Sequence, residues 1–154
     1  EKVDIWADKN IDESFSAQRS ESMRLLQVEA ELQEIVQLVG VDSLSSSDRL
    51  ILEVTRSIRE DFLHQNSFHE VDTYSSLHKQ YRMLGLILNF YNLAKDAISQ
   101  NVTINDITKM GVLEKIGRAK YVEEASVDAA YDEIEKETAA EIEKRIKERV
   151  ADEL

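Results

Sequence analysis

Gly111 and Gly117, followed by Arg118, are the part of the sequence that comes nearest to a phosphate-binding loop. Such a loop, G-x-x-x-x-G-K-[ST], needs four residues between its glycines, a lysine for the β- and γ-phosphates and a hydroxyl for magnesium. Here five residues separate the two glycines, and Arg118-Ala119 follows the second. We therefore predict two turn glycines and no phosphate loop in this chain.

The three histidines are the next candidates for chemistry. His69-Glu70 begins like the H-E-x-x-H helix of a zinc protease, but Thr73 stands where the second histidine is needed. His64 and His78 share no spacing with His69 that would bring three imidazoles to one helix face. We predict no metal site.

Carboxylates are abundant, with 31 Asp and Glu against 19 Lys and Arg, so the sequence cannot distinguish an acid/base pair from a solvated face. The net charge of −12 argues against nucleic acid and against an anionic membrane surface, since both require clustered basic residues. The absence of cysteine excludes thiolate catalysis, disulfides and zinc–cysteine sites. No apolar run approaches the ~20 residues that span a bilayer. Composition and motifs alone indicate a module without catalysis of its own.

The elements that carry these residues are predicted to be long helices, because proline is absent and only four glycines occur. One helix is expected from Met23 to Val39, with Gly40 in the left-handed conformation that often ends a helix. Its apolar face is predicted to consist of Leu25, Leu26, Val28, Leu32, Ile35, Val36 and Val39. A serine of the turn 42–47 should cap the next helix, which should pack antiparallel to the first because the turn is short. That helix carries Ile51, Val54, Ile58 and Phe62 on one face.

A third long helix is expected from about Ser76 to Gln100, with Gly85 where another helix can approach closely. Thr103 is expected to begin the first of two shorter helices. From Glu123 onward the chain holds twelve acidic and five basic residues. This last helix is expected to be amphipathic and lightly anchored, so that it packs at the edge of the bundle, pairs with a partner helix or frays.

The fold class that follows is all-α: a helical bundle of about three long helices, with short helices and an amphipathic acidic helix at the C-terminus. We divide the chain into a bundle of residues 1–122 and the acidic helix of residues 123–154, in the same domain or loosely packed. The sequence opens on Glu1 without an initiator Met. We therefore expect a piece of a longer polypeptide.

Two stretches of the sequence resemble the catalytic subunits of rotary ATP synthases. Residues 32–50, LQEIVQLVGVDSLSSSDRL, are similar to a helix of the L-Q-x-I-I type followed by a glycine and the turn D-E-L-S-E-E-D. Residues 59–72, REDFLHQNSFHEVD, resemble more closely the catalytic A subunit of archaeal and vacuolar-type ATP synthases, where F-L-x-Q-N-x-F-H-x-V-D is characteristic. Residues 79–84, KQYRML, and 114–121, EKIGRAKY, fit the same branch. The similarity extends over about residues 20–122.

The resemblance implies the C-terminal helical domain of an A subunit, whose phosphate loop, magnesium ligands and catalytic glutamate lie in a preceding α/β domain. The implied activity of the parent is ATP synthesis or hydrolysis coupled to proton or sodium transport. ATP or ADP with Mg²⁺ would be bound in the parent and none by this fragment, which would be inactive alone. The implied partners are the B subunits of the catalytic hexamer and the central-stalk rotor, without nucleic acid or direct membrane insertion. The implied location is the cytoplasmic face of the cell membrane, as a peripheral part of a membrane complex.

In this family the helical domain acts as a lever that swings against the rotor, and the resemblance assigns the contact to the tip between two helices. The predicted rotor-contact residues are Asp42, Ser43, Leu44, Ser45, Ser46, Ser47 and Asp48. Four of these positions match D-x-L-S-x-x-D, but serines replace the other acids of the motif. We therefore favour steric contact over contact through charge.

A second assignment by resemblance concerns nucleotide binding. In related catalytic subunits an aromatic residue from this region borders the adenine ring, and stacking suits a flat apolar base. Phe68, preceded by Gln65 and Asn66, matches that motif. The alternative for Phe68 is an ordinary core aromatic.

An alternative function remains at this point, a non-enzymatic helical adaptor that binds a basic or helical partner through the acidic last helix. A self-contained enzyme is disfavoured, because no nucleophile, metal cluster or phosphate cradle can be assembled from the sequence. The lever interpretation predicts a cooperative helical unit without ATPase activity. The adaptor predicts salt-sensitive binding that is lost when residues 123–154 are removed.

Overall fold

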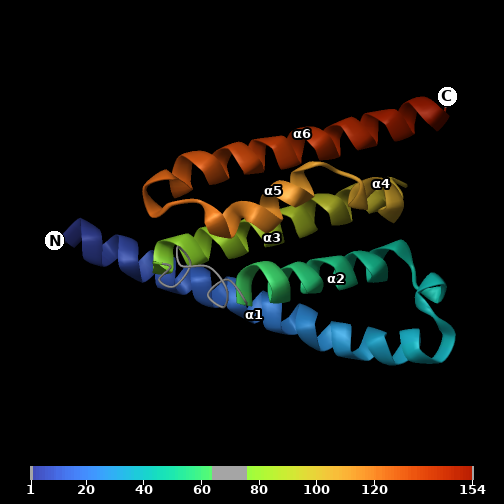
Figure 1. The fold of residues 1–154 in the computed structure, drawn as a ribbon, viewed down its shortest axis with the longest axis horizontal. Helices are drawn as coiled ribbons and strands as arrows, with labels where there is room; N and C mark the ends of the chain where they lie inside the picture. The colour runs from blue at the N-terminus through green and yellow to red at the C-terminus, as the bar shows by residue number, and fades with distance from the viewer. Residues whose placement is uncertain (1, 64–75, 154) are drawn as a thin grey trace.

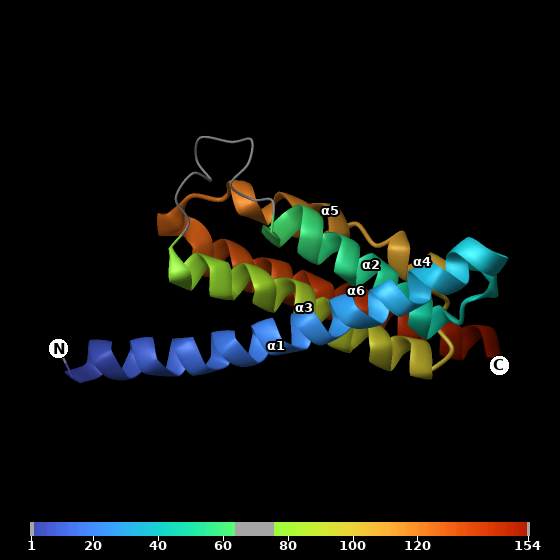
Figure 2. The same ribbon diagram turned by 90° about the horizontal axis from the view of Figure 1, so that it is seen from below.

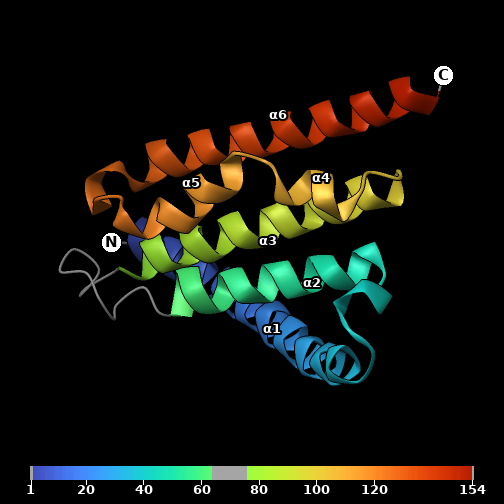
Figure 3. The same cartoon turned by 45° about the vertical axis from the view of Figure 1, so that its right-hand side comes forward.

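The computed structural model describes residues 2–63 and 76–153, with side chains from residue 13 onward. Every regular element in these ranges is a helix, which confirms the all-α class. Figure 1 shows the long helices side by side, with α1 and α6 on opposite sides of the bundle and α3 between them. In the turned view of Figure 3, α6, the pair α4 and α5, α3, α2 and α1 follow one another across the molecule.

Helix α1 (Lys2–Val39) begins well before the expected start at Met23. Its first turns extend beyond the other helices, as Figure 2 shows. At its other end, Gly40 has the positive φ that the sequence predicts, 89°. Its ψ of 160° lies outside the left-handed helical region, so Gly40 directs the chain into the 3₁₀ turn η1 (Val41–Ser43) instead of closing a left-handed cap.

Helix α2 (Ser46–Ser57) packs antiparallel to α1, as expected from the short connection (Figure 1). The predicted serine cap is Ser45, whose Oγ accepts a hydrogen bond from the amide of Asp48 at 3.1 Å. The chain then continues into a π-helical segment, η2 (Ile58–Leu63). Such wider turns are rare, and many of those that occur lie at functional sites.

Helix α3 (Leu77–Ser99) agrees with the predicted third helix and is capped by the hydroxyl of Ser76. Two short helices follow, α4 (Ile104–Thr108) and α5 (Val112–Arg118), and the first is capped by Thr103 as predicted. Gly111 precedes α5 as a turn residue, but Gly117 lies inside α5, so the prediction of a second turn glycine was wrong. Two 3₁₀ turns, η4 (Ala119–Tyr121) and η5 (Glu124–Ser126), lead to α6 (Val127–Glu153).

The core lies where α3 faces α1, α2 and α6. All four helices contribute deeply buried apolar side chains, among them Leu25, Leu50, Val54, Leu84, Ile87 and Tyr131. A Cβ added to Gly85 would lie 3.4 Å from Nε2 of Gln18, so α1 and α3 approach closely at the glycine, as predicted.

The acidic helix α6 is packed firmly over its first half. The hydroxyl of Tyr131 donates to the carbonyl of Ala119 at 2.7 Å, and Ile142, about three turns further along the same face, is also buried. Val150 in the last turns is 51% exposed. Light anchoring therefore describes only the end of α6. None of the helices in the described part of the chain is long and apolar enough to cross a membrane.

Candidate functional site

The predicted rotor-contact residues lie in the connection from α1 to α2 and in the first turn of α2, at one end of the bundle (Figure 1). The connection is held by short local hydrogen bonds. The hydroxyl of Ser43 donates to the carbonyl of Gly40 at 2.7 Å, and the amide of Leu44 donates to the carbonyl of Val41 at 3.1 Å. Together with the Ser45 cap, these bonds make residues 40–48 a compact turn, which we call the tip.

Most of the predicted contact residues are accessible at the tip. Asp42, Ser43, Ser45 and Ser47 are exposed, and Ser46 and Asp48 are partly exposed. Leu44 differs, because its side chain is only 9% exposed. It can fix the shape of the tip, but it offers little surface to a partner.

Exposed apolar side chains lie beside these residues and were not predicted from the sequence. Ile35, Leu38 and Val39 share one face of the last turns of α1, and we call them the apolar tip patch; Val41 in η1 is also exposed. Leu38 is 83% exposed and Val39 66% exposed. The assignment of Ile35 and Val39 to the core-facing stripe was wrong, because both side chains lie in solvent. The sequence does contain a signal for this exposure. Apolar residues stand side by side just before the glycine turn, and one helix face cannot bury them all.

The hairpin behind the tip is joined by a polar contact between its two helices. The carboxylate of Glu29 in α1 accepts a hydrogen bond from Oγ1 of Thr55 in α2 at 2.7 Å and pairs with Arg59 of η2. Thr55 is fully buried, and Val54 beside it belongs to the core. This contact therefore fastens α1 to α2 and η2 behind the tip.

The residues assigned to adenine contact, Gln65, Asn66 and Phe68, lie outside the described residues. The described chain reaches Leu63 on one side of them and resumes at Ser76 on the other. Helix α2 runs from the tip toward η2, and α3 begins at the end of the bundle away from the tip (Figure 1). Along the sequence, α2 and η2 stand between the candidate residues for rotor contact and those for nucleotide contact.

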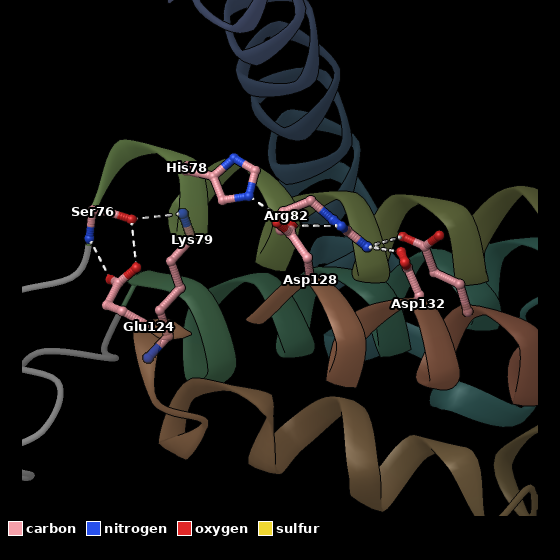
Figure 4. Close-up of polar contacts among 8 residues, drawn as sticks. Ser76, His78, Lys79, Arg82, Glu124, Asp128 and Asp132 are labelled. Atoms are coloured by element: carbon pink, nitrogen blue, oxygen red, sulfur yellow. Dashed lines mark hydrogen bonds and ion pairs between the residues drawn. The ribbon is translucent and has the colours of Figure 1, made fainter. Parts of the chain in front are cut away.

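At this second end, hydrogen bonds join the start of α3 to the chain between α5 and α6 (Figure 4). The amide and the hydroxyl of Ser76 both donate to the carboxylate of Glu124, at 2.8 and 2.7 Å. Lys79 is 1% exposed, and its ammonium donates to the carbonyls of Lys120 and Val122 at 2.8 and 2.7 Å. These contacts bring residues together that are more than forty positions apart in the sequence.

An ion-pair network continues along the same faces of α3 and α6 (Figure 4). Nε2 of His78 lies 2.7 Å from Oδ1 of Asp128. Arg82 reaches Asp128 at 2.9 Å, Asp132 at 2.8 Å and Glu135 at 3.5 Å. The hydrogen bond from His78, together with the nearby charge of Arg82, holds the pKa of Asp128 below its ordinary value.

The electrostatics of Glu124 depend on two opposing effects. Burial acts to raise the pKa of its carboxyl, but the hydrogen bonds from Ser76 and the nearby Lys79 charge outweigh it, so the pKa of Glu124 lies below its ordinary value. The carboxylate is thus stabilised in its charged form. No set of three or more His, Cys, Asp or Glu side chains in the ranges 2–63 and 76–153 could hold a metal ion.

Lys120 makes the corresponding contacts on the other side of the undescribed segment. Its Nζ donates to the carbonyl of Glu60 at 3.3 Å and lies 3.7 Å from Oδ1 of Asp61, both in η2. Oδ2 of Asp61 in turn accepts a hydrogen bond from the hydroxyl of Ser57 at 2.7 Å. The contact between Ser57 and Asp61 is local, but no sequence signal predicts those of Lys120, because they join residues about 60 positions apart.

Comparisons with known proteins agree with the resemblance. A family model described as the C-terminal domain of V and A type ATP synthase matches residues 4–108. The V-type ATP synthase alpha chain of Clostridioides difficile strain 630 is 76% identical over 154 residues, which is all of this chain and 26% of that relative. The corresponding proteins of Thermoanaerobacter pseudethanolicus and Acetivibrio thermocellus are 61% identical over 135 residues and 57% identical over 145 residues.

The alignments cover 88% and 94% of this chain in those two comparisons, and 23% and 25% of the relatives. The chain therefore spans about a quarter of the length of the curated relatives it matches. The family model covers more than half of the chain, and the quoted motifs lie within the part aligned with the Clostridioides difficile relative. The chain belongs to the family of C-terminal domains of V and A type ATP synthases.

Proposed function

We propose that this chain is the lever domain of the catalytic A (alpha) subunit of a rotary ATP synthase. In the parent it couples ATP synthesis or hydrolysis to the transport of protons or sodium ions by pushing on the central rotor. The observation that carries the lever role is the exposed tip, with its apolar patch, at the end of a fastened helix hairpin. The names of the relatives, V-type ATP synthase alpha chains, support the parent activity.

The geometry favours steric contact with the rotor. The tip carries Asp42 and Asp48 as its acids, and Asp48 is partly buried at the start of α2. The larger accessible surface is apolar, and an exposed apolar patch commonly marks an interaction site. A stiff hairpin is suited to this role, because rigid elements transmit a rotation without bending.

The nucleotide, ATP or ADP with Mg²⁺, would be held by residues of the parent that precede this chain. Phe68, with Gln65 and Asn66, would contribute an aromatic wall beside the adenine ring. The partners of the parent would be the B subunits of the catalytic hexamer and the central-stalk rotor subunit. The complex would work at the cytoplasmic face of the cell membrane, with this domain as a peripheral part.

A non-enzymatic adaptor is disfavoured by the contacts of α6. The acidic residues at its start are already paired within the bundle, Asp128 and Asp132 with Arg82, and Glu137 with Lys115 at 2.8 Å. To bind a basic partner, α6 would have to break these ion pairs. Its last turns offer no strong acidic surface instead, because acidic and basic residues are nearly balanced there.

A cysteine cross-link tests the rotor contact. The chain contains no cysteine, so Ser43→Cys places a unique thiol of this domain on the tip. In the assembled complex, a short thiol–amine linker should join Ser43→Cys to the rotor and stop ATP hydrolysis. Ser126→Cys, exposed in η5 at the other end of the bundle, is the matched control and should leave the rotor unlinked. Linkage from Ser126→Cys but not from Ser43→Cys would overturn the proposed orientation.

A further inference from the structure

Arg49 differs from the other arginines of the chain in its contacts. Each of the others forms an ion pair with a carboxylate, except Arg19, which lies over the ring of Phe15 at 4.7 Å. In the ranges 13–63 and 76–153, neither Asp48 beside it nor any other carboxylate or ring forms such a contact with Arg49. In a chain with a net charge of −12, the charge of this arginine is thus left unmatched.

Arg49 lines a polar cleft of about 280 Å³ between α1, α2 and α4. Figure 2 shows α4 beside α2 at the end of the bundle where α1 passes into the tip. Val41 of the tip forms part of the wall, so the cleft borders the surface that we assign to the rotor. Arg49 itself directly follows the tip and is partly exposed. A partner seated on the tip can therefore reach its guanidinium.

The other charges that line the cleft are paired with one another. Glu53 pairs with Arg56 at 2.7 Å, and Glu29 pairs with Arg59. Three arginines and two glutamates line the cleft, which leaves one positive charge, that of Arg49. The cleft is thus opposite in sign to the chain as a whole and favours an anionic group. A guanidinium is suited to a carboxylate, which it can bind through two parallel hydrogen bonds.

We propose that Arg49 binds a carboxylate of the rotor when the rotor lies against the tip. The inference rests on the proposed rotor contact and adds one directed interaction to a surface whose accessible part is mainly apolar. Apolar contact has no preferred direction, whereas an arginine–carboxylate pair sets the position and the orientation of a partner. Arg49 is therefore a residue that determines where the rotor is contacted, while the apolar tip patch supplies contact area.

Carbodiimide cross-linking tests for this carboxylate. The reagent joins an amine to a carboxylate where the two are in contact, and it does not join a guanidinium. In the assembled complex, Arg49→Lys should become linked by an amide to an aspartate or glutamate of the rotor, a link that is absent from the wild type and is identified by peptide mass spectrometry. Arg118→Lys is the matched control, because the side chain of Arg118 on α5 is 73% exposed, and it should give no link to the rotor. A link from Arg49→Lys only to its own chain or to another subunit would overturn the proposal.

Ion transport measures the consequence of losing the contact. Arg49→Gln breaks no ion pair of this chain, so its urea midpoint should equal that of the wild type. In the assembled complex, ion transport per ATP hydrolysed should fall about threefold, as expected for a partly exposed ion pair. Arg49→Lys keeps the charge and should retain most of the transport, and Arg118→Gln should transport like the wild type. Wild-type transport in Arg49→Gln would overturn the proposal.

The failure of this contact is distinguishable from the failure of the proposed function. If Ser43→Cys is linked to the rotor while Arg49→Lys is not, the lever assignment stands and the carboxylate contact is wrong. If neither variant is linked to the rotor, the proposed orientation of the tip is wrong, and the role of Arg49 with it.

Discussion

The two ends of the bundle are built in opposite ways. At the tip, the turn is held by its own backbone and by two serine hydroxyls, while the apolar side chains of Leu38 and Val39 lie in solvent. At the other end, charged groups of α3, including the buried Lys79, are bound to the chain between α5 and α6 and to α6 itself (Figure 4). An exposed apolar surface is suited to touching a partner, whereas long-range polar contacts are suited to holding separate segments in place.

Helix α2 with η2 runs from Ser46 at the tip to Leu63, toward the other end of the bundle. Its inner face belongs to the core through Leu50, Val54 and Ile58, so it cannot shift without repacking its neighbours. A close-packed core has no space into which one helix could shift alone, so its helices move together. The difference between the ends thus indicates one body with a contact surface at one end and an anchoring network at the other.

Removing the anchoring lysine should give the largest effect. Lys79→Ala leaves the carbonyls of Lys120 and Val122 without the ammonium that they bind, and it removes a buried side chain. We expect the free energy of unfolding of this chain to fall by about 3 kcal/mol. Urea unfolding measures it, with the exposed Lys109→Ala as the control. A loss as small as that of the control would show that the second end is not held by Lys79.

Changing the apolar tip patch should affect coupling and leave the fold intact. Leu38→Ser with Val39→Ser removes apolar surface that is already in solvent, so the free energy of unfolding should change by less than about 0.5 kcal/mol per site. In the assembled complex we expect ATP-driven ion transport to drop about tenfold, in line with the loss of an apolar contact of ~1.4 kcal/mol. Proton or sodium uptake by reconstituted vesicles measures it.

Leu44→Ala tests the difference between a buried and an exposed apolar residue within the tip itself. Because Leu44 is buried, its truncation should lower the free energy of unfolding by about 2 kcal/mol. Equal stability of Leu44→Ala and the wild type would contradict the buried position of this residue. If the variant with Leu38→Ser and Val39→Ser transports ions at the normal rate, the apolar tip patch is not part of the rotor contact.

Local signals in the sequence were sufficient for the helices and their caps. Ser45 and Thr103 cap helices because a hydroxyl can bind an amide three residues later, which is a property of short range. Ile35 and Val39 were misplaced, because α1 continues past the region that α2 covers, and periodicity does not show where a neighbouring helix ends. Lys79 carries no sequence signal at all for burial, since its partners lie 41 and 43 residues further along the chain.

The smallest expected effect is the pH dependence of the contacts that Glu124 and Asp128 make with the start of α3. The folded-state pKa values of Asp128 and Glu124 lie below the ordinary values of 3.8 and 4.5, so both carboxylates stabilise the fold above those values. This stabilisation is lost as the pH falls through the lowered values, because the folded state must then bind protons against its hydrogen bonds. Both residues are largely exposed, and solvent screening keeps the effect small. Urea midpoints between neutral pH and pH 3 should fall less steeply in Asp128→Asn than in the wild type, whereas Glu133→Gln, exposed on α6, should follow the wild type. A parallel fall in all three proteins would mean that the acid sensitivity of the fold arises away from the contact between α3 and α6.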